Sequence, residues 1–188
     1  EPAHDPVKDA LLQVLDGKLP LRVEAHRADE IRSALALAAD KKVPVLVLEQ
    51  PFAAGGCAAE LAKAGTSCVL TDVWPMTMPK PYEMFDMTTV PAALQARGVP
   101  FAIASGSGRR AGALAMMAAC AISRGLDEAA ALRSITLSAA EILGVQSDTG
   151  SLAQGKLGDV LVCDRPLFQS DCRVLAVLSA GKTQFEAK

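Results

Sequence analysis

The chain has 188 residues, 51% of them hydrophobic and 21% charged, a composition typical of one globular domain, or of part of a larger one, with enough apolar surface for a core. With 19 Lys and Arg residues against 21 Asp and Glu residues, the formal net charge is −2, which favours neither nucleic acid nor an anionic membrane as a partner. No apolar run reaches the roughly 18 residues of a membrane-spanning helix. Because the first residue is Glu1 and no signal peptide is visible, we expect a mature product or a fragment of a longer chain.

The first part of the chain alternates helical and strand patterns. Apolar residues at helical spacing predict a helix over 6–16, with Asp5 as its N-cap. Alternating apolar and polar residues predict a strand over 19–25, and a second helical pattern covers 28–42. The continuous apolar run V-P-V-L-V-L at 43–48 is typical of a strand in a sheet that is covered on both faces.

The same alternation continues toward the middle of the chain. Helices are predicted over 57–64 and 88–96, the second with Thr88 or Thr89 as its cap, and strands over 66–71 and 99–104. A long loop interrupted by prolines covers 74–87, between the strand at 66–71 and the helix at 88–96. Its Met and aromatic residues are expected either to fill the core or to cover a barrel mouth or a partner surface: Trp74, Met76, Met78, Tyr82, Met84, Phe85 and Met87.

The last part of the chain reads as helices followed by short strands. Helical patterns cover 109–124 and 127–135, and a strand is predicted at 160–163. The spacing Ser138-x-x-Glu141 predicts a capping box at the start of another helix, which Gly144 is placed to end. Finally, a hairpin is predicted from strands at 173–179 and 182–186, joined by Ala180-Gly181.

Four strand–helix units in succession predict a parallel α/β sheet. Both a doubly wound sheet and part of a (β/α)8 TIM barrel fit this pattern, and the periodicity does not choose between them. Four units cannot close an eight-stranded barrel, so a barrel interpretation predicts that another chain or segment covers the open sheet edge.

The five cysteines are odd in number and have no C-x-x-C spacing: Cys57, Cys68, Cys120, Cys163 and Cys172. This pattern predicts buried free thiols rather than a disulfide framework or a zinc knuckle.

The segment 134–164 carries a family resemblance. A Thr-x-x-x-Ala-x-x-Leu-Gly helix leads into Gly-Ser-Leu-x-x-Gly-Lys-x-Gly-Asp, and this resembles the C-terminal closing segment of metal-dependent amidohydrolases, especially imidazolonepropionase-like ones. The matching positions are Thr136, Ala140, Leu143, Gly144, Gly150, Ser151, Leu152, Gly155, Lys156, Gly158 and Asp159. Gly158 stands where the family usually has Ala.

This resemblance favours the barrel over the doubly wound sheet. It implies that residues 1–144 form half of an amidohydrolase-like barrel, strands five to eight, and that 145–188 form the C-terminal β segment of the side domain. The first four barrel units, with the His-x-His of the first strand, are absent from this sequence. The covering partner would then be another chain or the missing N-terminal half.

The resemblance also implies a metal site, which this sequence only partly retains. His26 matches the metal-binding His after the fifth strand, and neutral imidazole is a good zinc ligand. Gln50 replaces the family's His after the next strand, and Gly106 replaces the catalytic Asp after the last one. That Asp acts as general base and ligates the metal, and glycine can do neither. Without the resemblance, His26 reads as an ordinary strand-end histidine.

Other side chains at the strand ends are candidates for lining a ligand pocket: Glu24, Glu49, Asp72, Ser105 and Ser107. The alternative for Asp72 is a loop-capping role. The stretch 105–108 either holds an anion, together with Arg109 or Arg110, or is a plain Gly/Ser turn.

Three functions therefore remain in view. The first is an amidohydrolase-like segment with a degenerate metal site and a structural or regulatory role in a larger polypeptide or assembly. The second is a metal-dependent hydrolase of non-peptide C–N bonds, such as those of a cyclic amide, with zinc or another divalent metal and an N-terminal half supplied from elsewhere. The third is a module that binds a small ligand without chemistry.

Overall fold

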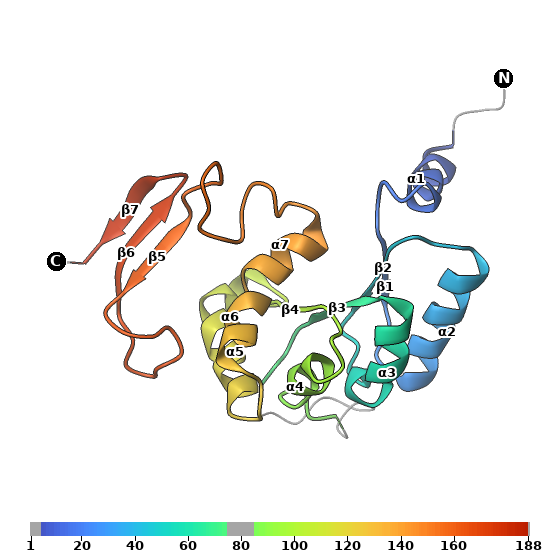
Figure 1. The fold of residues 1–188 in the computed structure, drawn as a ribbon, viewed down its shortest axis with the longest axis horizontal. Helices are drawn as coiled ribbons and strands as arrows, with labels where there is room; N and C mark the ends of the chain where they lie inside the picture. Colours follow the sequence, from blue (N-terminus) through green and yellow to red (C-terminus); the bar gives the residue numbers. More distant parts are fainter. Residues whose placement is uncertain (1–4, 75–84, 188) are drawn as a thin grey trace.

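The structure is a computed structural model that describes residues 5–74 and 85–187, and it contains two separate sheets (Figure 1). The first sheet is parallel, with its strands in the order β1-β2-β3-β4, and the second has the order β5-β6-β7 and is antiparallel. The first-sheet strands are β1 (Leu21–Glu24), β2 (Leu46–Glu49), β3 (Ser67–Leu70) and β4 (Phe101–Ile103). The prediction of a parallel α/β arrangement is confirmed. Met76, Met78, Tyr82 and Met84 lie outside the described residues.

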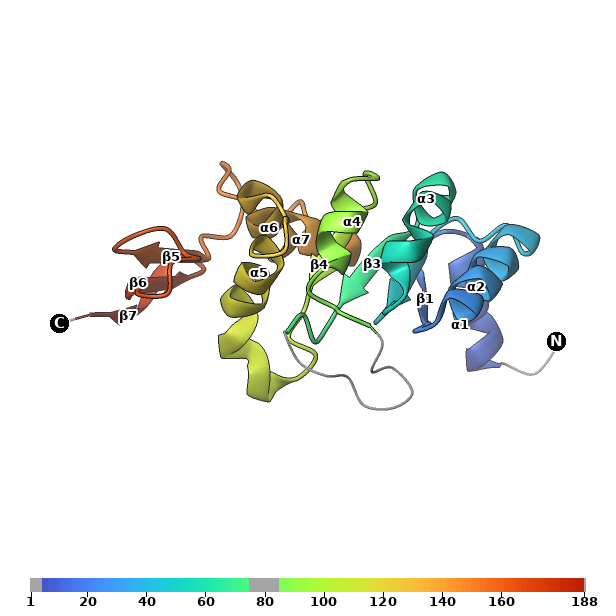
Figure 2. The ribbon, with the colours of Figure 1, turned by 90° about the horizontal axis from the view of Figure 1, so that it is seen from below.

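Helices connect the parallel strands and pack against one another around the sheet. The helical elements are α1 (Pro6–Leu15), α2 (Ala28–Asp40), α3 (Ala54–Ala64), α4 (Val90–Gln95), the 3₁₀ helix η1 (Gly108–Ala113), α5 (Leu114–Ile122), α6 (Glu128–Ser134) and α7 (Leu137–Leu143). Helix α2 contacts α3, α3 contacts α4, and α4 contacts α5, so the helices follow the order of the strands (Figure 2). Within the part of the chain that the structure describes, no helix has the length and apolarity needed to cross a bilayer.

The core lies between the helices and one face of the parallel sheet. Because side chains alternate along a strand, every second residue of β2, β3 and β4 points toward the helices. The strand and helix residues that form this core include Leu46, Leu48, Cys68, Leu70, Phe101, Ile103, Ile31, Leu61, Leu94 and Met117. Residues in between, among them Arg22, Glu24 and Glu49, share the opposite face of the sheet.

Several element boundaries follow from the predicted signals. The Asp5 carboxylate accepts hydrogen bonds from the backbone of Val7 and Lys8 at the start of α1, and Asp127 caps α6 in the same way through Ala130 N–H. Gly144 ends α7 with a φ of 74°, the left-handed conformation expected of it.

The predicted capping box at Ser138 and Glu141 is wrong. Helix α7 already begins at Leu137, so Ser138 lies inside the helix, and Thr136 at the N-cap makes no side-chain cap hydrogen bond. The Glu141 carboxylate instead accepts hydrogen bonds from the Arg133 guanidinium at 2.7 and 2.9 Å. Because Arg133 of α6 binds the Glu141 carboxylate, that carboxylate does not complete a capping box.

Other boundaries shift for local reasons. The strand predicted at 43–48 begins only at Leu46, since Val43 N–H donates to Ala38 O and so belongs to the end of α2. The helix predicted from residue 109 begins as the 3₁₀ turn η1, and α3 begins three residues earlier than predicted, at Ala54. Neither threonine caps α4 through its side chain: Thr89 stands at the N-cap without a cap hydrogen bond.

The antiparallel sheet lies at the end of the molecule away from the N-terminus (Figure 1). Its strands are β5 (Val160–Cys163), β6 (Val174–Ser179) and β7 (Lys182–Glu186). Ala180 and Gly181 have φ angles of 48° and 73° between the paired residues Ser179 and Lys182, as the two-residue hairpin required.

Candidate functional site

His26 lies two residues beyond the end of β1 and is held on several sides. Its backbone N–H donates to the Glu30 carboxylate at 2.8 Å, and its side chain is 17% exposed. The ring stacks on Phe52 with centroids 4.5 Å apart and an interplanar angle of 11°. Helix α2 therefore holds the backbone of His26, and the segment after β2 packs against its ring.

Both ring nitrogens of His26 face oxygen atoms. Nδ1 is 2.9 Å from the carbonyl oxygen of Gln50, and Nε2 is 3.0 Å from a carboxylate oxygen of Glu24. A carbonyl and a carboxylate both accept, so both contacts are hydrogen bonds only when each nitrogen carries a proton. A hydrogen bond from Nδ1 to a carbonyl is also the arrangement that turns Nε2 of a ligating histidine toward a metal. Here Glu24 occupies that direction.

The two positions where the resemblance implies further ligands do not supply them. Gln50 follows β2 directly with a φ of 51°, and its backbone, rather than its side chain, contacts His26. Gly106 has a φ of 69°, and a Cβ built on it would lie 3.3 Å from Cβ of Thr71. An Asp at position 106 would therefore need Thr71 to give way.

The described residues do not by themselves form a group of metal ligands. Among residues 5–74 and 85–187, no group of three or more His, Cys, Asp and Glu side chains is arranged to hold one. Glu24 and His26 are two adjacent candidates, whereas zinc sites use three protein ligands when catalytic and four when structural.

Glu49 is not available as a free carboxylate, because it forms an ion pair with Arg22. The register places Glu24 beside Glu49 and Arg22 beside Val47 on the same face of the sheet. Arg22 therefore balances one of two neighbouring carboxylates. Sequence reasoning missed Arg22, although the alternation that put Glu24 on this face places Arg22 there too.

Asp72 forms a second ion pair, between the segments that follow β3 and β4. It follows β3 with a φ of 56°, pairs with Arg110 of η1, and accepts a hydrogen bond from the Thr71 hydroxyl at 3.3 Å. These contacts tie two loops together, as the loop-capping interpretation expects. Ser105, half-buried, and Ser107, exposed, lie in the loop after β4. Because all four strands are parallel and paired in the order β1-β2-β3-β4, these candidates lie in a row along one edge of the sheet.

A groove of about 1020 Å³ lies away from these strand ends, between α6, α7 and β5. Its walls are mainly apolar, with Leu132, Leu143 and Leu161 among them, and Arg133 and Asp159 at its polar parts. None of the strand-end candidates lines it.

The four-stranded parallel sheet with its helices and the separate antiparallel sheet match part of a (β/α)8 barrel with a side sheet. The model of the Amidohydrolase family matches residues 85–184, more than half of the chain. The chain belongs to the amidohydrolase family. No curated protein sequence matches it.

Solved structures share this fold over most or all of the chain. An amidohydrolase from Thermotoga maritima MSB8 is 26% identical with a TM-score of 0.90, covering 100% of this chain and 49% of its own. A zinc-bound adenosine deaminase from Xanthomonas campestris has 22% identity and a TM-score of 0.67 over 95% of this chain and 48% of its own. A β-aspartyl dipeptidase from Fervidobacterium islandicum AW-1 is 18% identical with a TM-score of 0.65, and the match covers 87% of this chain and 46% of the dipeptidase. The chain spans about half the length of these structures.

Proposed function

We propose that this chain is the C-terminal half of an amidohydrolase scaffold that does not itself carry out metal-dependent hydrolysis, and that it has a structural or regulatory role in a larger polypeptide or assembly. The barrel part would cover residues 1–144 and the side segment 145–188. The observation that carries the proposal is the state of the strand ends: Gln50 and Gly106 supply no ligand, and Glu24 occupies the Nε2 side of His26.

Zinc binding tests this proposal. Titration of the purified chain with zinc, followed by calorimetry and by metal analysis after gel filtration, is expected to find no stoichiometric site, and His26→Ala should leave the result unchanged. The double variant Gln50→His with Gly106→Asp adds two ligand side chains, and once Thr71 gives way it is expected to bind zinc more tightly than the wild-type chain. One equivalent of zinc in the wild-type chain that is lost in His26→Ala would instead favour the metal-dependent hydrolase.

We further propose that another chain, or a missing N-terminal half, covers the open edges of the parallel sheet. Strands β1 and β4 both end the strand order, and unpaired strand edges favour association. Helix α1 adds an exposed apolar face: it contains no buried residue, and Val7, Leu11, Leu12 and Leu15 are 68%, 52%, 57% and 49% exposed. A protein that spans about half of its structural relatives supports a partner of complementary size.

Light scattering tests the proposed edge. The 19.5 kDa chain by itself is expected to self-associate through its open surfaces, giving a mass above that of one chain. Leu11→Lys, on the apolar face of α1, should shift the population toward the monomer. Gln13→Lys adds the same charge to an exposed position of the same helix and should not. A stable monomer at all concentrations would contradict the need for a covering partner.

A further inference from the structure

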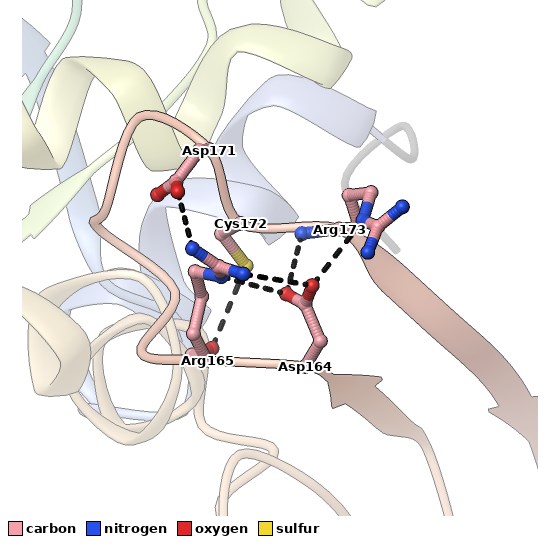
Figure 3. Close-up of polar contacts among 5 residues, drawn as sticks. All are labelled: Asp164, Arg165, Asp171, Cys172 and Arg173. Atoms are coloured by element: carbon pink, nitrogen blue, oxygen red, sulfur yellow. Dashed lines mark hydrogen bonds and ion pairs between the residues drawn. The ribbon is translucent and has the colours of Figure 1, made fainter.

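The connection between β5 and β6 is held by a cluster of charged residues around Asp164 (Figure 3). Asp164 N–H donates to Arg173 O at 3.1 Å, and Arg173 N–H donates to the Asp164 carboxylate at 2.9 Å. The guanidinium groups of Arg173 and Arg165 contact the same carboxylate at 3.2 and 3.3 Å, and Arg165 also pairs with Asp171. The backbone hydrogen bond from Arg173 is the main cause that lowers the pKa of Asp164. The carboxylate therefore ties the two ends of this loop together.

The pairing of Asp164 with Arg173 brings two cysteines to the same face of the β5–β6 pair. Cys163 is paired with Val174, and Asp164 with Arg173, so the next pair along is Arg165 with Cys172. The contact of 3.6 Å between the Cys172 thiol and the carbonyl oxygen of Arg165 agrees with that register. Continued past the ends of β5 and β6, this register makes Cys163 and Cys172 diagonal neighbours on one face. The irregular register between Val162 and Cys163 adds twist at this point.

Cys172 also influences the titration of Cys163, in agreement with this placement. Burial, together with a hydrogen bond to the Cys172 thiol, raises the pKa of Cys163. Both cysteines are free thiols and only partly buried, so small reagents have access to them. Cys57 and Cys68 differ, since both are buried and burial raises the pKa of Cys68 to about 12.

We propose that Cys163 and Cys172 form a reversible intramolecular disulfide when the protein meets a low-molecular-weight disulfide. One thiolate attacks a sulfur of the reagent, forming a mixed disulfide and releasing one reagent thiol. The second protein thiolate attacks the mixed disulfide and releases the other reagent thiol. The two protein thiols are oxidised, the reagent disulfide is reduced, and the two protein protons leave on the two released thiols.

The bond would close the loop of residues 164–171, which the Asp164 cluster already holds. Cys163 also lines the groove between α6, α7 and β5. Oxidation therefore restrains one wall of that groove as well as the loop between β5 and β6. Cys163 and Cys172 would thus be a redox modification site of the antiparallel sheet.

Mass spectrometry of the native protein after exposure to oxidised glutathione tests the proposal. Trypsin does not cleave between Arg165 and Pro166, so both cysteines lie in the one tryptic peptide 157–173. We expect that peptide to lose the mass of two hydrogens in more than half of the molecules and to regain it on reduction, while Cys57 and Cys68 stay reactive to alkylation after unfolding. Cys120→Ser should behave as wild type.

Cys163→Ser keeps the proposal falsifiable, since it leaves Cys172 without its partner. We expect the peptide 157–173 of this variant to carry one glutathione adduct instead of the internal bond. A wild-type peptide that stays reduced, or that carries glutathione on both cysteines, would overturn the proposal.

Discussion

Replacing Gly150 with Ala is expected to lower the free energy of unfolding by about 3 to 5 kcal/mol, the sum of backbone strain and overpacking. Gly150 has a φ of 88°, and a Cβ there would lie 2.6 Å from Cβ of Ala140, 3.1 Å from Cα of Leu137 and 3.2 Å from the carbonyl oxygen of Thr136. Two of these atoms are backbone atoms at the start of α7, which cannot move without displacing the helix.

Gly155→Ala is the matched control for this prediction. Gly155 has nearly the same φ, 90°, but nothing lies within 4 Å of a Cβ built on it. It should therefore cost only the strain of a left-handed residue, about 1 to 2 kcal/mol. Urea unfolding followed by the fluorescence of Trp74, the single tryptophan, measures both variants. An equal loss in the free energy of unfolding for the two variants would show that the close approach of residue 150 to α7 adds no cost beyond backbone strain.

Leu61→Ala is expected to have an effect of similar size, a loss of about 2 to 5 kcal/mol in the free energy of unfolding. Leu61 lies in α3, is 0% exposed, and belongs to the core between the helices and the parallel sheet. Shortening it removes apolar contacts and leaves a cavity that close-packed neighbours fill only partly.

Leu37→Ala makes the same chemical change at the surface of α2, where Leu37 is 51% exposed. It should change the free energy of unfolding by less than about 0.5 kcal/mol. The two variants are compared by urea unfolding of the purified chain. A loss at Leu37 as large as that at Leu61 would mean that the surface of α2 is covered in solution.

The sequence predicted the strand–helix alternation well and the strand ends less completely. The strand patterns placed all four parallel strands: β2 gave a continuous apolar run because it is buried on both faces, and β1 gave an alternating pattern because it is not. His26 was found as the candidate ligand, but the sequence did not indicate that Glu24 would face its Nε2 atom or that Phe52 would stack on its ring. The stacking joins residues on different elements, and the contact with Glu24, two residues away, depends on how the side chains turn after the strand ends.

Free thiols were predicted correctly for all five cysteines, although only Cys57 and Cys68 are buried. The loop residues Trp74, Phe85 and Met87 pack against or within the core, as one of the two interpretations of that loop expected. The failed capping box at Ser138 shows the limit of such local motifs. Its spacing was correct, but Arg133 on the preceding helix competes for Glu141.

The sequence by itself determined the class of fold, the family and the absence of a ligand side chain at Gly106, because alternation, capping residues and residue identity are local properties. Only the tertiary structure decided how the remaining strand-end groups pair: Glu49 with Arg22, Asp72 with Arg110, and Glu24 with His26. It also brought Cys163 and Cys172 to one face of the β5–β6 pair. The physical reason is that a parallel sheet brings together residues far apart in the sequence, as with Glu49 and Arg22 or Asp72 and Arg110. The contact between Glu24 and His26, two residues apart, depends instead on the directions that packing gives to the two side chains.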